Sequence, residues 1–525
     1  MPVHGFKVFK VFKDAYVDSV LQLGATRAMR ERDGVEWAAA AMGTPANLET
    51  LAGQGFDDTS GATANDCFLA VVASDEDLLP GTLEAGEGAL FSARGGTAAA
   101  CAVPGGAAPA RPKSLDEAAA TLAGANVAIV SVPGDYAALE AHKALSRGLH
   151  VLLFSDNVPL EEEIELKDHA AERGLLVMGP GAGTAMLGGT GLAFANATGN
   201  GDGERAKTVG IVAAAGTGAQ EAMSLLDRYG ARVTTVIGVG GRDLSAAVGG
   251  RMAGRAVAAL REDPGTDAVL LVSKPPDEDV AAAVVAEAGD MPLVAALIGL
   301  DTPIAVPPGV RLARTLEQGV LDTLDVIGLP RPDLGAGLVD SVTEACAGLG
   351  DGRRLVRGLF SGGTLCYEAL VILSGLLGPI HSNTPLDKRY GLPAPDGAHV
   401  CLDLGEEEFT KGRPHPMIDP EARVELIRTE GARDDVAVVL LDVVLGHGSH
   451  PDPAGQLAPA LTEIRDGGRG PAVVAYVLGT EGDAQGLEAQ RATLRDIGCL
   501  VPPTAARAAY ATAAIARRRP DVVAS

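Results

Sequence analysis

Aromatic side chains are scarce in this chain. Phe, Trp and Tyr together make up 3% of its 525 residues, with a single Trp. An aromatic-lined β-sandwich is therefore not expected, and the abundant Ala, Val, Leu and Gly suit thin layers in which helices pack closely on sheets. Because 47% of the residues are apolar, the chain can build a sizeable core. Its length predicts about three domains.

Cysteine and positive charge are also scarce. The six cysteines include no CxxC pair and no zinc-type cluster, which argues against a disulfide framework and indicates a reducing compartment. There are 43 Lys and Arg against 68 Asp and Glu, a formal net charge of −25. This balance argues against binding to nucleic acid or to an anionic membrane surface, so local donors must hold any anionic ligand. A general acidic habit of the source proteome is an alternative explanation.

Membrane, nicotinamide and metal signals are missing. No continuously apolar run reaches 18 residues and residues 1–16 contain no apolar signal-peptide core, so a cytoplasmic protein is expected. No GxGxxG is followed by an acidic residue about 20 positions on, so no nicotinamide cofactor is expected. Asp, Glu and His do not recur at a fixed helical spacing, so no metal site is predicted.

A small-residue turn that opens a helical pattern occurs twice. Residues 209–213 form an apolar run typical of a buried parallel strand, and small residues follow at 214–218. Residues 361–368 share the layout, and in both copies a Glu follows a Thr by four positions. A helix start has unpaired N–H groups and partial positive charge, so a phosphate can rest there. The predicted phosphate-binding residues are Gly216, Thr217, Gly218, Gly362, Gly363 and Thr364. A tight turn without a ligand is the alternative.

The rest of the chain alternates strands and helices, which predicts parallel sheets covered on both faces. Four domains are predicted, at 1–95, 114–200, 205–328 and 351–525, with a linker at 92–113 and a polar connection at 328–350. The expected strands are 7–12, 35–42, 67–73, 126–132, 150–154, 175–178, 209–213, 233–238, 268–273, 293–298, 311–314, 400–404, 436–444, 472–478 and 499–501. Helices are expected at 18–32, from 48, and at 137–147.

Polar residues follow several of these strands, where ligands of such sheets bind. Arg242 and Lys274 are the cations expected nearest a bound anion, and solvated loop ends are the alternative. His415, His447 and His450 lie in two Gly- and Pro-containing loops of the last domain. Histidine can move protons or hold phosphate, although an isolated histidine is more often structural.

The ordered set of motifs resembles known families. SVPGDY (131–136), SDNVPLEE (155–162), VMGPGAG (177–183), KTVGIVAAAGTGAQEA (207–222) and IGVGG (237–241) resemble the succinyl-CoA synthetase α subunit. VVLLDVVLGHGSH (438–450) is similar to the carboxyl domain of its β subunit, and the fused layout with MGTPAN, SGGTLCYEA and GRPHPMIDP is similar to the FdrA family. The resemblance implies an α/β fold with a Rossmann-like CoA-binding-type domain, two flavodoxin-like succinyl-CoA-synthetase-type domains and a small N-terminal α/β domain.

The resemblance also implies roles for particular residues. It adds Gly446 and Gly448 to the phosphate-binding set and makes His447 and His450 candidate acid–base catalysts, with Arg242 and Lys274 stabilising charge. The residues expected to bind substrate are Pro133, Gly181, Gly240, Gly241, Arg413 and His415. The family's phosphorylated His is replaced by the His-free run 298–303, its acidic strand end by 273–276, and its ATP-grasp region is missing. A phosphohistidine relay is therefore not expected.

Three functions fit this pattern. The first is acyl or carbamoyl transfer involving phosphate, as in an oxamate carbamoyltransferase subunit that converts oxalurate and phosphate to oxamate and carbamoyl phosphate during ureide breakdown. The second is an acyl-CoA synthetase that binds CoA and needs a partner to supply nucleotide. The third is a scaffold subunit without catalysis. Partner subunits and a homo-oligomer are expected in each case.

Overall fold

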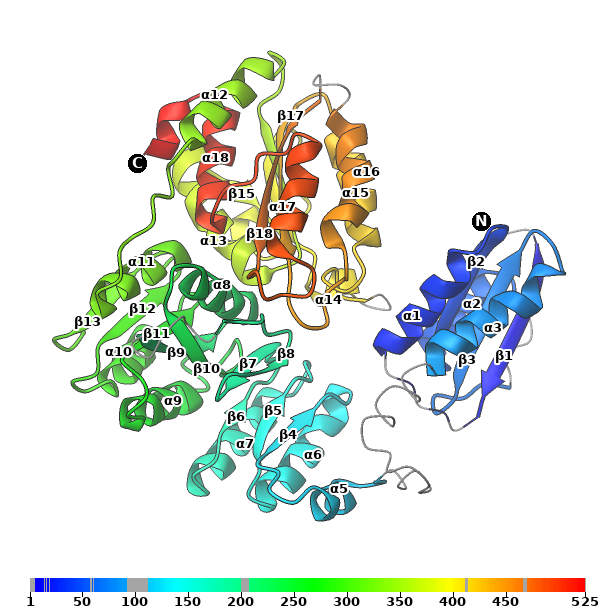
Figure 1. Cartoon of the computed structure of the whole chain (residues 1–525), viewed down its shortest axis with the longest axis horizontal. Coiled ribbons are helices and arrows are strands. Elements are labelled where there is room, and N and C mark those ends of the chain that lie inside the picture. Colours follow the sequence, from blue (N-terminus) through cyan, green and yellow to red (C-terminus); the bar gives the residue numbers. More distant parts are fainter. Residues whose placement is uncertain are drawn as a thin grey trace. The chain divides into compact units, whose positions relative to one another are not determined.

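The computed structural model describes residues 5–13, 15, 17, 19–56, 59, 61–91, 112–199, 207–410, 414–465 and 470–524. The chain divides into two compact units, residues 1–112 with 410–414 and residues 113–409 with 415–525 (Figure 1). Of the predicted linker 92–113, only the last two residues are among those described, and Arg413 lies outside them.

The N-terminal unit is a small α/β domain. Its elements are β1 (Phe6–Phe12), α1 (Ser19–Arg30), β2 (Val35–Met42), α2 (Pro45–Gly53), β3 (Cys67–Ala73) and α3 (Leu78–Phe91). The strands form an antiparallel sheet in the order β1-β3-β2. β3 is buried at every position because it is central and apolar clusters cover both of its faces. α2 begins three residues before the predicted position 48, since the Thr44 side chain accepts a hydrogen bond from the Asn47 N–H and Pro45 suits a first helical turn.

The second unit begins with a parallel sheet of Rossmann type. Its elements are α5 (Leu115–Thr121), β4 (Val127–Val130), α6 (Gly134–Ser146), β5 (His150–Leu153), α7 (Leu160–Glu172) and β6 (Val177–Met178), with strand order β4-β5-β6. The sequence prediction missed a hairpin of β7 (Thr184–Leu187) and β8 (Thr190–Ala193). Its strands are short, and Gly188 and Gly189, both at positive φ, make the turn between them.

The next part is doubly wound around a parallel sheet that the hairpin extends. Its elements are β9 (Thr208–Ala214), α8 (Gly216–Arg228), β10 (Arg232–Gly238), α9 (Arg251–Glu262), β11 (Ala268–Ser273), α10 (Glu278–Ala286), β12 (Leu293–Leu297), β13 (Val310–Ala313) and α11 (Leu316–Ile327). The strand order is β13-β12-β11-β9-β10-β7-β8. All five strands predicted here are confirmed to within a residue or two.

The last part has a second parallel sheet, in the order β15-β16-β14-β17-β18. Its strands are β14 (Leu355–Phe360), β15 (Ile380–His381), β16 (His399–Asp403), β17 (Val436–Val444) and β18 (Ala472–Leu478). Its helices are α12 (Leu338–Gly348), α13 (Gly363–Leu377), α14 (Glu407–Thr410), α15 (Glu421–Gly431), α16 (Pro453–Arg465), α17 (Leu487–Asp496) and α18 (Ala505–Arg517), with short 3-10 turns at Lys388–Tyr390 and Pro520–Ala524.

Three predictions for this last part were wrong or incomplete. The expected polar connection 328–350 contains α12, whose Leu338 and Val342 are buried on one side. β14 and β15 were not expected, because Arg357 interrupts the apolar run of β14 and β15 has only two residues. The expected strand 499–501 makes a single bridge, from Leu500 to Val474.

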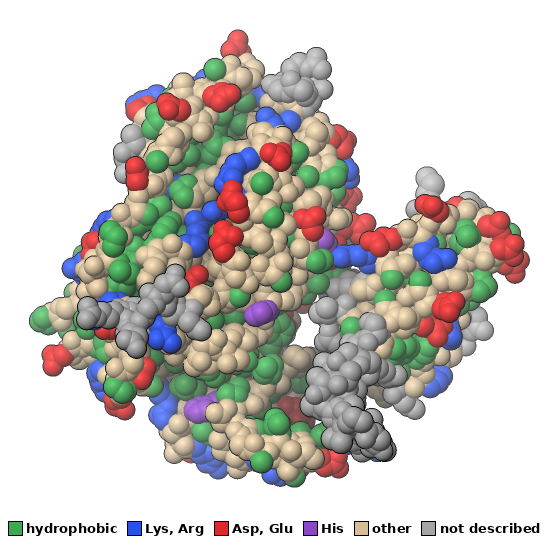
Figure 2. Space-filling model, in the orientation of Figure 1, with side chains coloured by type: hydrophobic (Ala, Val, Ile, Leu, Met, Phe, Trp, Pro, Cys, Tyr) green, Lys and Arg blue, Asp and Glu red, His purple; other side chains and the backbone are tan. Residues whose placement is uncertain are grey.

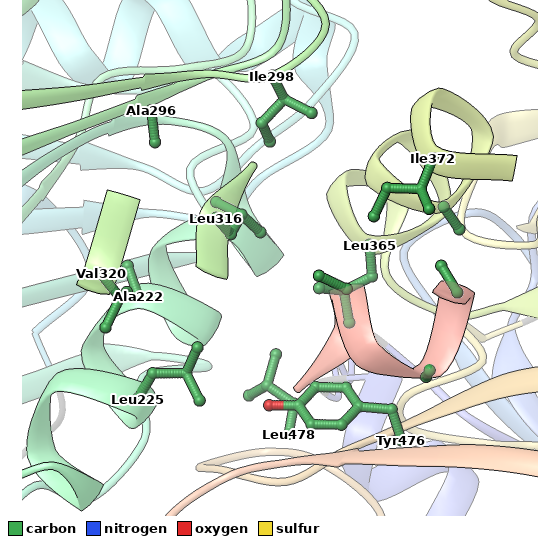
Figure 3. Packing of buried hydrophobic residues seen from close by; sticks show 14 of the residues in the cluster. Ala222, Leu225, Ala296, Ile298, Leu316, Val320, Leu365, Ile372, Tyr476 and Leu478 are labelled. Carbon is green, nitrogen blue, oxygen red and sulfur yellow. The ribbon is translucent and has the colours of Figure 1, made fainter. Parts of the chain in front are cut away.

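The two doubly wound parts pack through equivalent helices. α8 and α11 of the first meet α13 and α18 of the second, and one apolar cluster runs through both (Figure 3). The carboxyl of Glu221 on α8 accepts the Ala505 N–H at the start of α18 at 3.4 Å. Reciprocally, the carboxyl of Glu368 on α13 accepts the Leu316 N–H at the start of α11 at 2.6 Å. Each motif Glu therefore binds the N-terminus of a helix in the opposite part.

The surface carries charges of both signs. On the face viewed in Figure 2, Asp and Glu side chains are scattered among Lys and Arg and do not gather in one large patch. Among the helices in the described ranges, we find none that combines the length and the apolar character needed to cross a bilayer.

Candidate functional site

The two Gly-rich turns meet, although 147 positions separate their threonines. The Thr364 N–H donates a hydrogen bond to Thr217 Oγ1 at 3.2 Å. A Cβ on Gly218 would lie 2.9 Å from Thr364 Cγ2, and one on Gly362 would lie 3.0 Å from Thr217 Cγ2. Only glycine allows this approach, which brings the first turns of α8 and α13 together at the carboxyl ends of β9 and β14.

The two helix starts differ in which donors remain available. At α8, the N-terminal cap residue Ala215 offers no side-chain acceptor, and within the described ranges the N–H groups of Gly216, Thr217 and Gly218 donate to no protein atom. A Cβ on Gly216 would meet nothing within 4 Å, so the approach to these N–H groups is open. This turn has the geometry of an anion site.

The start of α13 already holds an anionic group of the protein. The carboxylate of Asp442, on β17, accepts the N–H groups of Ser361 at 2.8 Å and Gly362 at 2.7 Å. Arg423 pairs with the same carboxylate at 3.1 Å, and both side chains are buried. A phosphate at this turn therefore has fewer free donors than one at α8.

A second carboxylate, a histidine and a lysine surround this helix start. A Cβ on Gly363 would collide with Asp403 Oδ2, and one on Gly405 would lie 2.7 Å from His415 Nε2 and 3.2 Å from Asp403 Oδ1. Asp403 and His415 are therefore neighbours. Lys274 Nζ, from the end of β11, lies 5.7 Å from the centroid of the Tyr367 ring on α13. We call Lys274, Asp403 and His415, together with the first turns of α8 and α13, the candidate site.

Burial shifts the pKa values of this site. It raises the pKa of Asp403 to about 6, against the opposing effect of the Lys274 charge. Burial lowers the pKa of His415 to about 4, an effect opposed by the charge of Asp442. At neutral pH His415 is therefore an uncharged imidazole beside a carboxyl that titrates near neutrality, which is suited to proton transfer. Asp156, in the loop after β5, also acts electrostatically on His415.

Arg242 lies in a different ionic network. Its guanidinium pairs with Glu163 on α7 at 2.8 Å and donates to the Val158 carbonyl at 2.7 Å. Lys167 pairs with Glu163 and Asp243, at 2.7 Å each, and all three side chains are fully buried. This network joins the Rossmann-type part to the loop after β10, so Arg242 already has a carboxylate partner.

The other predicted binding glycines line loops that touch one another. A Cβ on Gly240 would lie 2.6 Å from the Gly179 carbonyl carbon, so the loop after β10 packs on the loop after β6. A Cβ on Gly181 or Gly241 would meet nothing within 4 Å, so both positions are open. Pro133 is the N-terminal cap residue of α6.

The histidine loop after β17 packs against residues 194–196. Two of its backbone N–H groups already have acceptors, because the Gly446 N–H donates to Gln485 Oε1 at 3.3 Å and the His447 N–H to the Ala195 carbonyl at 3.1 Å. A Cβ on Gly448 would lie 3.0 Å from the Phe194 ring. The His447 side chain is exposed.

His450 is placed differently from His447. Its side chain is buried, with Nδ1 accepting the Asp452 N–H at 3.0 Å. Its own N–H donates to the Met417 carbonyl at 2.8 Å, which ties this loop to the one that carries His415. His415 is therefore the histidine that the geometry associates with Asp403.

Sequence reasoning missed Asp403, Asp442 and Arg423. The two aspartates sit in otherwise apolar strands, CLDLG and VVLLDVV. A charged residue inside a buried strand requires a partner, so this position was a usable signal. Arg423 gave no such signal, because an Arg on a helix is ordinarily solvated.

Two family models match the chain. The family described as CoA-ligase matches residues 359–515, which cover most of the second parallel sheet and its helices. The family described as AllF, heavy metal-associated domain, matches residues 6–102.

The described residues of the N-terminal domain do not fit a heavy metal. Cys67 is buried on β3, where burial raises its pKa to about 11, whereas soft metals need an accessible thiolate. Within the described part of the chain, no three His, Cys, Asp or Glu residues are grouped to hold an ion. We therefore assign no metal to the described residues of this domain.

Similar proteins extend over the whole chain. The uncharacterized protein YahF of Escherichia coli (strain K12) is 35% identical over 505 residues, which is 93% of this chain and 94% of YahF. The succinate–CoA ligase [ADP-forming] subunit alpha of Methanothermobacter thermautotrophicus (strain ATCC 29096 / DSM 1053 / JCM 10044 / NBRC 100330 / Delta H) is 25% identical over 41% of this chain and 74% of that subunit. A solved dinucleotide-forming acetyl-coenzyme A synthetase 1 of Ca. Korarchaeum cryptofilum covers 76% of this chain and 84% of its own, at 15% identity and a TM-score of 0.28, too low to place any residue by analogy. The chain belongs to the same family as YahF, within the CoA-ligase (succinyl-CoA synthetase α-like) group, and carries an AllF-type N-terminal domain.

Proposed function

We propose that this chain is a subunit of an enzyme that transfers a carbamoyl or acyl group to or from phosphate. The best-fitting reaction is that of an oxamate carbamoyltransferase, in which oxalurate and phosphate give oxamate and carbamoyl phosphate. The observation that carries the proposal is the open first turn of α8, which lies against the start of α13 beside Lys274, Asp403 and His415. The AllF-type domain supports a role in allantoin breakdown.

The proposed reaction balances without nucleotide or metal. An oxygen of hydrogen phosphate attacks the carbamoyl carbon of oxalurate, the bond from that carbon to the bridging nitrogen breaks, and this nitrogen leaves as the amide of oxamate. The proton that phosphate loses is the one that the leaving nitrogen requires. Asp403, with a pKa of about 6, and neutral His415 can together carry that proton.

The same residues can stabilise the negative charge of the reaction. The free N–H groups of Gly216, Thr217 and Gly218 would hold the phosphate oxygens, and the Lys274 ammonium would hold the carboxylate or the carbonyl oxygen. The open positions Gly181 and Gly241 leave space for substrate in front of the sheet. Asp442 occupies the N–H groups of Ser361 and Gly362, so we place the phosphate at α8.

The test is formation of carbamoyl phosphate from oxalurate and phosphate, followed by ³¹P NMR. It is run with the purified chain and with the proteins that co-purify with it. We expect Lys274→Gln and His415→Gln to reduce the rate at least tenfold, and Lys388→Gln, an exposed control lysine, to leave it unchanged. Turnover that is equal in all four proteins would contradict the proposed site.

An acyl-CoA synthetase is the second candidate. It is favoured by the match of residues 359–515 to CoA-ligase and by the likeness to a succinate–CoA ligase subunit. This function would need a partner subunit to bring nucleotide and a phosphate carrier. Binding of CoA to the chain, together with CoA-dependent turnover when nucleotide and partner are supplied, would favour it over carbamoyl transfer.

A further inference from the structure

Buried polar atoms without partners gather at the end of α8 opposite the candidate site. Thirteen buried side-chain nitrogen or oxygen atoms in the described residues have no hydrogen-bond partner, and four of them belong to three neighbouring side chains. These atoms are Arg228 Nη1, Tyr229 Oη, Arg491 Nε and Arg491 Nη2. All four can donate a hydrogen bond. Ser224 Oγ, one turn before Arg228 on the same helix face, is a fifth such atom.

The three side chains act on one another. Burial lowers the pKa of Arg491, and the positive charge of Arg228 lowers it further. Tyr229 interacts electrostatically with both arginines. The position of Arg228 is set by a hydrogen bond from Nη2 to the Pro503 carbonyl at 2.9 Å and by the Tyr229 ring, whose centroid lies 5.7 Å from Arg228 Cζ. Arg228 Nη1 has no hydrogen-bond acceptor in the described residues.

Two acids act on this pair from a distance, since the charge of Glu221 raises the pKa of Arg228 and that of Glu488 raises the pKa of Arg491, but both acids have other hydrogen-bond or ion-pair partners. Glu488, on the same helix as Arg491, pairs with Arg495. The carboxyl of Glu221 accepts the Tyr476 hydroxyl at 2.6 Å, and Figure 3 shows Tyr476 reaching from β18 toward α8. Two like charges, partly buried and with N–H groups that have no acceptor, are unfavourable unless an anion joins them.

We propose that Arg228, Arg491 and Tyr229 form a binding site for a small oxyanion, a phosphate or carboxylate group. Guanidinium N–H groups bind such oxygens in pairs, and the phenol supplies a further donor. The 13 residues of α8 span about 20 Å, so this site is separate from the free N–H groups at the start of that helix. The inference goes beyond the proposed function, because occupancy here would act on Arg228 of α8 and Arg491 of α17 and not on the reacting groups.

The test compares the full chain with Arg491→Gln and with Arg495→Gln as the matched control. Arg495 lies on the same helix but is ion-paired with Glu488 and half-exposed. Each protein is titrated with inorganic phosphate, and separately with acetate, by calorimetry in low-chloride buffer. We expect Arg491→Gln to weaken one binding event at least tenfold, and Arg495→Gln to leave both titrations unchanged. Whichever of the two anions binds more tightly indicates whether the natural ligand carries a phosphate or a carboxylate group.

Melting temperature supplies a second readout that a merely structural arginine would not give. Without added anion, Arg491→Gln should melt above the wild type, because it removes a repelling buried charge. Adding phosphate or acetate should raise the melting temperature of the wild type and leave that of the variant unchanged. Equal anion binding in wild type and Arg491→Gln, or a variant that melts lower in every buffer, would overturn the proposal.

Two further variants keep the proposal testable. Arg491→Lys keeps the charge but not the planar fork, so it should bind anion more weakly than wild type even if Arg491→Gln folds poorly. Lys274→Gln, in the candidate site, should leave the binding event that depends on Arg491 intact. Loss of that event in Lys274→Gln would show that there is one anion site and not two.

Discussion

Replacing Glu368 with Gln should make the protein more stable at alkaline pH and change little at acidic pH. Glu368 is fully buried at the contact between α13 and α11. Burial raises its pKa from 4.5 to about 8, and the charge of Glu221 raises it further. Its Oε1 accepts the Leu316 N–H, whereas its Oε2 has no partner in the described residues.

The direction of the pH effect follows from comparing the protonation of Glu368 in the folded and unfolded chains. Between pH 4.5 and about 8 the folded protein keeps the proton on Glu368 while the unfolded chain has lost it. The free energy of unfolding therefore falls as the pH rises through this window. A difference of 3.5 pKa units (8 − 4.5) corresponds to roughly 5 kcal/mol, an upper limit reached above pH 8. Gln cannot ionise, so the variant avoids this loss and still offers an oxygen to the Leu316 N–H.

The assay is urea denaturation of the wild type and Glu368→Gln at pH 5 and pH 8.5. We expect the midpoints to agree within error at pH 5 and the variant to unfold at higher urea at pH 8.5. Glu425→Gln, at an exposed position on α15, is the control and should follow the wild type at both pH values. A variant that loses stability at pH 8.5 would refute the reasoning, because it would show that the buried carboxylate stabilises the fold.

Three other substitutions test the candidate site. Asp442→Asn leaves the buried Arg423 charge without its partner, so the free energy of unfolding should fall by about 3–5 kcal/mol in thermal or urea denaturation. Thr217→Ala removes the acceptor of the Thr364 N–H and should cost about 1 kcal/mol in the same assay, whereas Thr217→Ser should retain the bond. Between pH 6.5 and about 4, the unfolded chain binds a proton at His415 that the buried side chain in the folded protein does not bind, so the free energy of unfolding falls as the pH falls. His415→Gln should abolish this part of the acid destabilisation. An unchanged curve of stability against pH would contradict this.

Much of the fold could be predicted because buried parallel strands have a strong local signature. The runs 268–273, 436–444 and 472–478 match β11, β17 and β18 to the residue. Long apolar runs rich in β-branched residues and bounded by turn residues are compatible with few structures other than a buried strand. The misses occurred where this signature is weak: β15 has two residues, the β7–β8 hairpin is short, and Arg357 interrupts β14.

The candidate site could be predicted only in part, because which residues meet depends on packing. The sequence indicated both Gly-rich turns and Lys274, and the structure brings the turns together through Thr217 and Thr364. The sequence did not indicate that Asp442 would accept the N–H groups of the second turn, because the two motifs look alike locally. The expected role of His447 stays a prediction: its exposed side chain lies beside Gly191, while His415 is the histidine next to Asp403.

The likeness between the two doubly wound parts explains why only one turn is open. Both sheets share a central strand followed by a Gly-rich helix start, and both helices carry a Glu that binds the opposite part. If both starts kept free N–H groups and no anion were bound, two partial positive charges would face each other across the Thr217–Thr364 contact. The carboxylate of Asp442 accepts the two N–H groups just before α13, whereas the N–H groups at the start of α8 have no protein acceptor in the described residues. A site with one such occupied turn and one open helix start is expected to bind a single phosphate, as the proposed carbamoyl transfer requires.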